Sequence, residues 1–176
     1  MQSDALVIGL DLSLASTGLV VLGDAADVRE TTALTTKLRG MERLADIEGR
    51  VLVRVGRDTR LWVIEGYSFG SKNMAKHMEL AELGGVVKQA LWRAKQTVLV
   101  VPPTRVKKFA CGAGNAKKDD MRLAVYKRWG FEARTTDEVD AYALARIGLA
   151  YLGLDDKLTG PQREIVTALR GEEETA

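Results

Sequence analysis

The sequence has few of the residues that build several common types of active site. Its 176 residues include one cysteine, Cys111, and one histidine, His77. A single cysteine excludes an intramolecular disulfide framework, and a single histidine excludes a zinc site held by several histidines. A Ser-His-Asp triad would have to use His77, which lies in a polar stretch typical of a surface helix.

Long hydrophobic runs and targeting segments are missing as well. No apolar stretch approaches the ~20 residues needed to cross a bilayer, and the first residues lack the pattern of a signal peptide. We therefore expect a soluble, cytoplasmic protein. With 46% hydrophobic residues, the chain can form one substantial core. We expect a domain over residues 1–154 and a polar tail over residues 155–176, with a short helix from Pro161 to Leu169.

Positive and negative charges are nearly balanced over the whole chain, but they are unevenly distributed along the sequence. Lys plus Arg total 26 against 24 for Asp plus Glu, a weak argument for a polyanionic partner. Between residues 93 and 134 the only acids are Asp119, Asp120 and Glu132. The basic residues there are Arg93, Lys95, Arg105, Lys107, Lys108, Lys117, Lys118, Arg122, Lys127, Arg128 and Arg134. Such a run is either a solvated face or a nucleic-acid-binding surface, and charge alone does not decide.

Hydrophobic periodicity predicts an alternation of strands and helices. Aliphatic runs typical of strands cover Ala5–Leu10, Gly18–Gly23, Thr31–Thr36, Leu61–Ile64 and Thr97–Val101. Helical spacing covers Met41–Val55, Ser71–Trp92, Thr104–Ala110, Lys117–Arg128 and Thr135–Leu152. This order is typical of an α/β fold in which helices cover both faces of a mixed sheet.

Two acidic residues come directly after buried-looking strands. Asp11 follows the run that ends at Leu10, and Glu65 follows Leu61–Ile64. In open α/β sheets, ligands bind beyond the carboxyl ends of the strands. A carboxylate there carries a desolvation cost, which a metal ion shared between strand ends ~4.8 Å apart would offset.

Two further acids lie in the helix that opens at Thr135. Asp137 and Asp140 are three residues apart and therefore share one face of that helix. Glu138 is off this face and completes a capping box with Thr135, which gives it a sufficient structural role. Four acids without histidine or cysteine suit hard cations such as Mg²⁺ or Mn²⁺, and two such ions can hydrolyse a phosphodiester.

Four motifs within residues 5–153 resemble, in order, those of the RuvC family of Holliday-junction resolvases. They are Gly9–Gly18; Val63–Glu65 with Phe69, Asn73 and Leu83–Val86; Pro103–Lys108 with Gly112–Lys118; and Asp137–Ala145. The resemblance implies an RNase H-like fold with a mixed five-stranded sheet. It also implies a homodimer that cuts four-way DNA junctions with Mg²⁺, for which Mn²⁺ can substitute. The chain departs from the family at Ser13, where many members have a Pro-Gly turn.

The same resemblance assigns roles to individual residues. The residues that would hold the metal ions, two per site, are Asp11, Glu65, Asp137 and Asp140. Lys107 and Lys118 match basic positions that contact DNA near the scissile phosphate. Neighbouring residues expected to bind DNA with them are Arg105, Lys108 and Lys117. Phe69 matches an aromatic residue that stacks on unpaired bases, but the motif around Glu65 is one residue longer here, so Tyr67 remains an alternative.

The predicted helix over Ser71–Trp92 is apolar on two sides. One row consists of Leu80, Leu83, Val87 and Leu91, and a second consists of Met74, Met78, Ala81 and Gly85. One row is enough to dock the helix on its own sheet. We expect the second row to form a homodimer interface, which fits the resemblance to a dimeric family, with coverage by the C-terminal tail as the alternative.

Three other functions are compatible with parts of the sequence. The first motif is similar to the phosphate loop of sugar kinases and actin, but Ser13 replaces the loop glycine and those proteins are about twice as long. An RNase H-like nuclease that acts on RNA, flaps or forks uses the same acids. A junction-binding protein without catalysis is disfavoured, because binding alone does not need buried carboxylates that face DNA.

Overall fold

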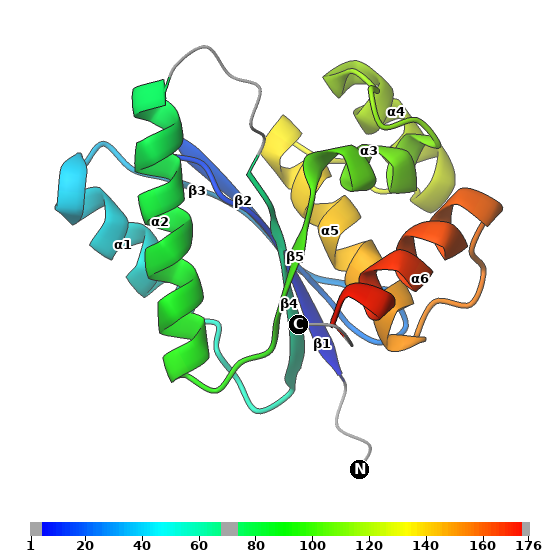
Figure 1. Cartoon of the computed structure of the whole chain (residues 1–176), viewed down its shortest axis with the longest axis horizontal. Coiled ribbons are helices and arrows are strands. Elements are labelled where there is room, and N and C mark those ends of the chain that lie inside the picture. Colours follow the sequence, from blue (N-terminus) through cyan, green and yellow to red (C-terminus); the bar gives the residue numbers. More distant parts are fainter. Residues whose placement is uncertain (1–4, 68–73, 174–176) are drawn as a thin grey trace.

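The structure is a computed structural model that describes residues 5–67 and 74–173, and its centre is a mixed sheet (Figure 1). The strand order is β3-β2-β1-β4-β5. The strands are β1 (Leu6–Asp11), β2 (Ser16–Leu22), β3 (Val28–Thr35), β4 (Thr59–Glu65) and β5 (Val98–Val101). β1, β2 and β3 are antiparallel neighbours, whereas β1, β4 and β5 run parallel. The predicted mixed sheet of five strands is confirmed.

Helices cover both faces of this sheet, as predicted (Figure 1). One face carries α1 (Gly40–Leu52) and α2 (Met74–Arg93). The other carries α3 (Pro103–Cys111), α4 (Lys118–Trp129), α5 (Thr136–Leu152) and α6 (Gly160–Glu173). The helices predicted for these segments agree with the observed ones to within a few residues at each end. Residues 71–73 of the predicted second helix lie outside the described residues.

Alternation of side chains along the strands divides the core into two halves. In β1, Val7 packs in the half formed with α5, whereas Ile8 and Leu10 pack in the half formed with α1 and α2. In β4, Leu61 and Val63 belong to the α5 half, and Ile64 belongs to the other. Because strand side chains alternate with a period of two, Asp11 and Glu65 both project toward the α5 side.

Glycines bring α5 into direct contact with the sheet. A Cβ atom added to Gly9 of β1 would lie 1.9 Å from the carbonyl oxygen of Ala141 and 2.6 Å from the amide nitrogen of Ala145. On the helix side, a Cβ on Gly148 would lie 2.5 Å from Val7. These positions exclude any larger residue unless the backbone shifts. The close approach fixes the distance between α5 and the ends of β1 and β4.

The segment after residue 154 is packed onto the domain and is not a separate tail. It forms the 14-residue helix α6, longer than the short helix predicted for Pro161–Leu169. Ile165, Val166 and Leu169 are buried in the α5 half of the core. Their helical spacing gives α6 one apolar stripe, which explains why a segment that is polar overall docks. No helix in the described ranges is long and apolar enough to cross a membrane.

Candidate active site

The carboxyl ends of two parallel strands place the first two acids side by side. β1 and β4 are paired in parallel with Leu10 opposite Ile64, and each strand ends at the next residue. Asp11 is 9% exposed, and Glu65 is partly exposed. Both side chains lie on the α5 side, and they are hydrogen-bonded to each other. The sequence-based placement of these two acids at one edge of the sheet is therefore confirmed.

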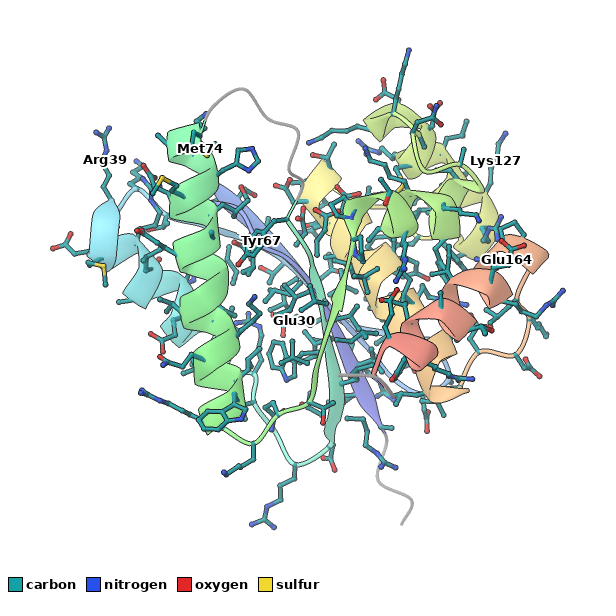
Figure 2. All side chains as sticks on the ribbon, in the orientation of Figure 1. Glu30, Arg39, Tyr67, Met74, Lys127 and Glu164 are labelled. Atoms are coloured by element: carbon teal, nitrogen blue, oxygen red, sulfur yellow. The ribbon has the colours of Figure 1, made fainter. Side chains whose placement is uncertain are left out.

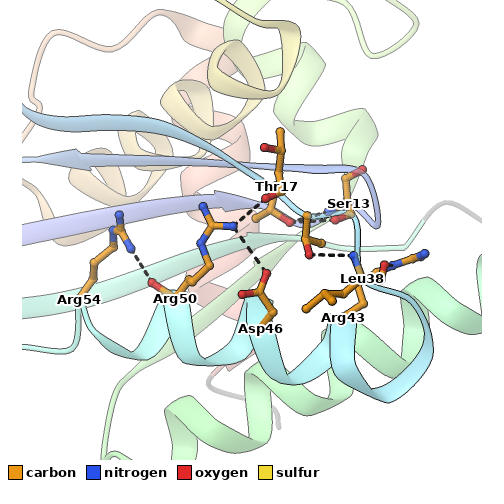
Figure 3. A network of polar contacts seen from close by, with 9 residues as sticks. Ser13, Thr17, Leu38, Arg43, Asp46, Arg50 and Arg54 are labelled. Atoms are coloured by element: carbon orange, nitrogen blue, oxygen red, sulfur yellow. Dashed lines mark hydrogen bonds and ion pairs between the residues drawn. The ribbon is translucent and has the colours of Figure 1, made fainter.

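The turn that follows Asp11 is closed by a buried threonine (Figure 3). The hydroxyl of Thr17 donates to the carbonyl oxygen of Ser13 at 2.9 Å and accepts from the Ser13 amide at 3.1 Å. Thr17 is fully buried. Its two bonds hold the β1–β2 turn directly after Asp11, with Ser13 as their partner.

Several basic residues near this turn are engaged in structural contacts (Figure 3). Arg50 of α1 donates to the carbonyl oxygen of Thr35 at 2.8 Å, which ties α1 to the edge strand β3. Arg43 donates to the carbonyl oxygen of Leu38 at 2.9 Å. Exposed ion pairs and single hydrogen bonds of this kind contribute modestly to stability. These contacts give Arg43 and Arg50 structural roles that do not involve the site.

The N-terminus of α5 brings the second pair of acids to the same edge. Thr135 caps the helix by accepting a hydrogen bond from the amide of Glu138 at 3.2 Å. The buried Glu138 carboxylate accepts from the amides of Thr135 at 3.4 Å and Arg134 at 2.7 Å. The predicted capping box and the structural role of Glu138 are confirmed.

Gly18 lets the first turn of α5 settle on β2 directly beside Asp11. Gly18 is opposite Asp11 in the antiparallel register. A Cβ on Gly18 would lie 2.1 Å from the carbonyl oxygen of Asp137, so a larger residue would push the helix away. Asp140 lies one turn further along α5 and is partly exposed. Four acids from β1, β4 and α5 thus gather at one edge of the sheet.

The electrostatics of these acids show that they act on one another. Burial raises the pKa of Asp11 well above its usual value, and repulsion from the other three acids raises it further, against the attraction of Lys118. Burial and then repulsion from Asp140 raise the pKa of Glu65 to about 7, although the hydrogen bond with Asp11 and the charges of Lys107 and Lys118 oppose this.

Asp140 belongs to the same electrostatic cluster. Burial raises its pKa to about 6; Lys118 and Lys107 oppose the rise, and Asp137 adds to it. The cluster is not a preformed metal cage, however. Within residues 5–67 and 74–173, no three acidic, histidine or cysteine side chains converge closely enough to hold a metal ion. In this conformation the acids act on one another through their charges.

The predicted basic residues divide into two groups. Lys107 of α3 and Lys118 of α4 act electrostatically on the acids. Arg105 instead forms a bidentate ion pair with Glu172 of α6, at 2.8 and 2.5 Å, and Lys108 pairs with Glu164 at 2.9 Å. The structure therefore brings two of these cations to the site and engages two with α6. Lys117, directly before α4, is exposed.

The two aromatic candidates have different surroundings. Tyr67 packs against α2, where its hydroxyl donates to the carbonyl oxygen of Ala81 at 3.2 Å and lies over Gly84 (Figure 2). The ammonium group of Lys88 lies 5.2 Å from the centre of its ring. These contacts cover part of the Tyr67 ring. Phe69 lies outside the described residues.

One face of α2 has exposed side chains. Leu83, Val87 and Leu91 of the first predicted row are buried, and Leu80 is half-buried. In the second row, Met74 is 71% exposed and Met78 is 62% exposed; the remaining members, also exposed, are Ala81 and Gly85. Figure 2 shows Met74 at the outer end of this helix. α6 packs on the opposite face of the sheet, so the alternative in which the C-terminal segment covers this row is wrong (Figure 1).

Sequence analysis missed several residues that shape the site. Gly9, Gly18 and Thr17 position the acids, and all three lie inside the first motif, so their presence in that motif was an available signal. Trp92, 69% exposed, follows Met78 and Gly85 at a seven-residue spacing and extends the exposed face of α2. Its spacing was visible in the sequence, but its exposure was not.

Comparison with known proteins identifies the family. Residues 7–147 match the family profile described as "Crossover junction endodeoxyribonuclease RuvC". The chain belongs to the RuvC family. A RuvC from Prochlorococcus marinus, described by the same words, is 26% identical over 156 residues, which cover 81% of this chain and 97% of the relative. One from a Synechococcus strain is 31% identical over 108 residues, which cover 59% and 68%.

Solved RuvC structures show the same fold. "Thermus thermophilus RuvC structure" superposes with a TM-score of 0.66 at 23% identity, over 85% of this chain and 97% of that one. "T. thermophilus RuvC in complex with Holliday junction substrate" gives a TM-score of 0.68 at 24% identity, over 84% and 93%. The predicted RNase H-like α/β fold and the predicted RuvC family are thereby confirmed.

Proposed function

We propose that this chain resolves four-way DNA junctions by metal-dependent phosphodiester hydrolysis, in the cytoplasm, with Asp11, Glu65, Asp137 and Asp140 as the metal-binding acids. One observation carries the assignment of these residues. Two strand ends and one helix N-terminus, far apart in sequence, contribute four mutually repelling acids to one edge of the sheet. Such an arrangement is unfavourable for folding and is typical of a functional site.

The donor chemistry of the site fits Mg²⁺, with Mn²⁺ as a substitute. The four donors are carboxylates, which hard divalent cations prefer, and four of them provide enough oxygens for two ions. When bound, such ions activate a water molecule and stabilise the leaving oxygen of the phosphodiester. The raised pKa values of Glu65 and Asp140 mean that metal binding near pH 7 is coupled to release of protons.

The chain's own residues have separate tasks in this proposal. The acids would hold the ions, whose positive charge would offset the repulsion among the four carboxylates. Lys107 and Lys118, which face the acids, bind the phosphates on either side of the cleaved bond. Because Tyr67 is held against α2, we assign stacking on unpaired bases to Phe69.

A second copy of the chain completes the proposal. The exposed row of α2 contains two small residues, Ala81 and Gly85, that allow another helix to approach closely. A four-way junction has near two-fold symmetry, and its resolution needs two opposed cuts. A two-fold dimer through α2 supplies two identical sites for these cuts.

The test is cleavage of end-labelled DNA in Mg²⁺, with matched four-way, fork, flap and linear duplex substrates. We expect paired cuts near the crossover of the four-way junction, and little cleavage of the duplex. Asp140→Asn should lower the rate by at least about a thousandfold while junction binding in Ca²⁺ is kept, since it removes charge but preserves shape.

Asp24→Asn is the matched control, because Asp24 is an exposed acid that follows β2 at the opposite edge of the sheet. It should cut at the wild-type rate. Preferred cleavage of flaps, forks or RNA would replace the proposed substrate by the alternative one. Binding without cleavage by the wild-type protein would leave a junction-binding protein, and robust cleavage in EDTA would contradict the metal mechanism.

A further inference from the structure

Helix α6 holds α3 through contacts that surround Lys107. The side-chain nitrogen of Gln162 donates to the carbonyl oxygen of Phe109 at 3.0 Å. The ion pairs of Arg105 with Glu172 and of Lys108 with Glu164 add two more links between the helices. Figure 2 shows Glu164 on α6 beside α3. α6 lies beyond the residues 7–147 that match the family profile, so these contacts are not part of the matched motifs.

Gln162 is the buried member of this group of contacts. It is 2% exposed, and its side-chain oxygen accepts from the amide of Thr159 at 2.9 Å and from the Thr159 hydroxyl at 3.1 Å. Both ends of the amide are therefore fixed. Phe109 is in the last turn of α3, where carbonyl groups lack partners within the helix. Without Gln162 this buried carbonyl would lose its hydrogen-bond partner, which destabilises the contact between α6 and α3.

The position of α3 determines where Lys107 lies, and the charge of Lys107 acts on Glu65 and Asp140. Lys107 lies between Arg105 and the pair formed by Lys108 and Phe109, so α6 contacts α3 on both sides of it in sequence. A lysine ammonium group is carried on a flexible stem, and its mean position follows the backbone that bears it. A shift of α3 therefore moves the cation relative to Glu65 and Asp140.

We propose that Gln162 is a positioning residue, which fixes α3 and with it Lys107 against the carboxylates, and that α6 serves as a brace for the active site. This inference rests on the proposed nuclease function. In the same contact, Glu164 and Glu172 occupy two cations of α3, so that Lys107 is the cation of this helix that serves the cleaved phosphate.

The test is a double-mutant cycle between Gln162 and Lys107, measured by junction cleavage with the full-length protein in Mg²⁺. Gln162→Met keeps the length of the side chain and removes its hydrogen bonds. It should lower kcat about tenfold and change KM less than about twofold, because binding by other cations is kept. In a Lys107→Ala background the same substitution should lower kcat by less than about twofold, since residues that act through one another are not additive.

Arg163→Gln is the matched control on the same helix, because exposed Arg163 bonds to Leu158 and not to α3. It should leave kcat unchanged in both backgrounds. Equal losses from Gln162→Met with and without Lys107 would overturn the proposal, since a merely structural role is additive. An unchanged kcat in Gln162→Met would overturn it as well.

A second variant covers the case in which Gln162→Met does not fold. Glu164→Gln combined with Glu172→Gln removes both ion pairs, and the protein should still fold because exposed ion pairs contribute little to stability. This double variant should lower kcat about twofold to threefold, with no further effect in the Lys107→Ala background. A double variant with wild-type kcat would contradict the brace.

Hydrogen exchange separates failure of the brace from failure of the proposed nuclease function, because it needs no DNA. Amide exchange in the last turn of α3 should be at least about tenfold faster in Gln162→Met than in the wild type, and unchanged in Arg163→Gln. If the wild-type protein cuts no branched DNA, the proposed function fails while this measurement still reports on the brace. Unchanged exchange in Gln162→Met would overturn the brace itself.

Discussion

α5 and α2 pack on opposite faces of the same sheet but differ in how many of their sides are covered. α5 is buried on most of its surface, and its partners include β1, β2, β4, α3, α4 and α6. α2 buries one row, which includes Leu83 and Val87, and exposes Met74 and Met78. The covered helix carries two of the four acids, whose position relative to the strand ends must be fixed, whereas the half-covered helix leaves an apolar row exposed.

The largest expected difference between the two helices comes from replacing a glycine by alanine at the α5 packing surface and at the exposed face of α2. Gly9→Ala places a Cβ against backbone atoms of α5, and we expect a loss of more than about 3 kcal/mol in the free energy of unfolding. Gly85→Ala meets nothing within 4 Å and should stabilise α2 by about 0.5–1 kcal/mol. Urea unfolding of both variants at low protein concentration measures the difference.

A Gly9→Ala protein with wild-type stability would show that α5 can move away from β1 at little cost. In that case the acids of α5 are not rigidly placed, and the contrast with α2 disappears. The Gly85→Ala variant controls for the general effect of replacing glycine.

The second prediction concerns pH. The folded-state pKa values of Asp11, Glu65 and Asp140 are raised, so without divalent metal the folded protein binds more protons than the unfolded chain above about pH 4. These groups should therefore lower the free energy of unfolding as pH rises from about 4.5 through about 7, where Glu65 loses its proton. The rise of the Glu65 pKa from 4.5 to about 7 corresponds to a loss of folding stability on the order of 3 kcal/mol at most.

Urea unfolding in EDTA between pH 4.5 and 8 tests this, with Glu65→Gln as the informative variant. Glu65→Gln should flatten the slope, and Asp24→Asn should keep it. Millimolar Mg²⁺ should restore stability to the wild type at pH 8, since a ligand that binds only the folded state stabilises it. Identical slopes in wild type and Glu65→Gln would mean that the acids at the sheet edge are not coupled to folding.

The smallest expected effect on the folded chain comes from charge on the open face of α2. Ala81→Arg should leave the free energy of unfolding of the monomer within about 0.5 kcal/mol, because the position is exposed. It should weaken dimerisation at least about tenfold, through repulsion between two like charges close to the two-fold axis. Sedimentation at micromolar concentration measures this.

Ala168→Arg makes the same change at an exposed alanine of α6, on the other face of the molecule, and should leave the dimer intact. A wild-type protein that sediments as a monomer, both alone and on junction DNA, would rule out the dimer. The exposed row of α2 would then have no role in assembly.

The sequence predicted those parts of the site that depend on local pattern. Strand periodicity and strand ends were enough to place Asp11 beside Glu65, and helical spacing was enough to put Asp137 and Asp140 on one face. The packing distance between α5 and the sheet was not predictable, because it depends on Gly9 and Gly148, which only the folded chain brings together.

Pairing of charges between distant segments was not predictable either. Arg105 and Glu172 are 67 residues apart, and Lys108 and Glu164 are 56 residues apart. A basic run looks the same in sequence whether acids from another helix cover it or DNA does. The spacing of Ile165 and Leu169 indicated that α6 has an apolar side. Nothing in the sequence indicated which helix that side would pack against.

The central position of α5 also has a consequence during synthesis of the protein. The ribosome adds β1 and β4 early, whereas the helix that fills the space between the two halves of the site is translated late. Until residue 137 has emerged, the nascent chain has only two of the four acids and lacks the helix that packs on Gly9. An unfinished polypeptide therefore lacks the complete acid cluster, and a chain that ends before α5 cannot form it.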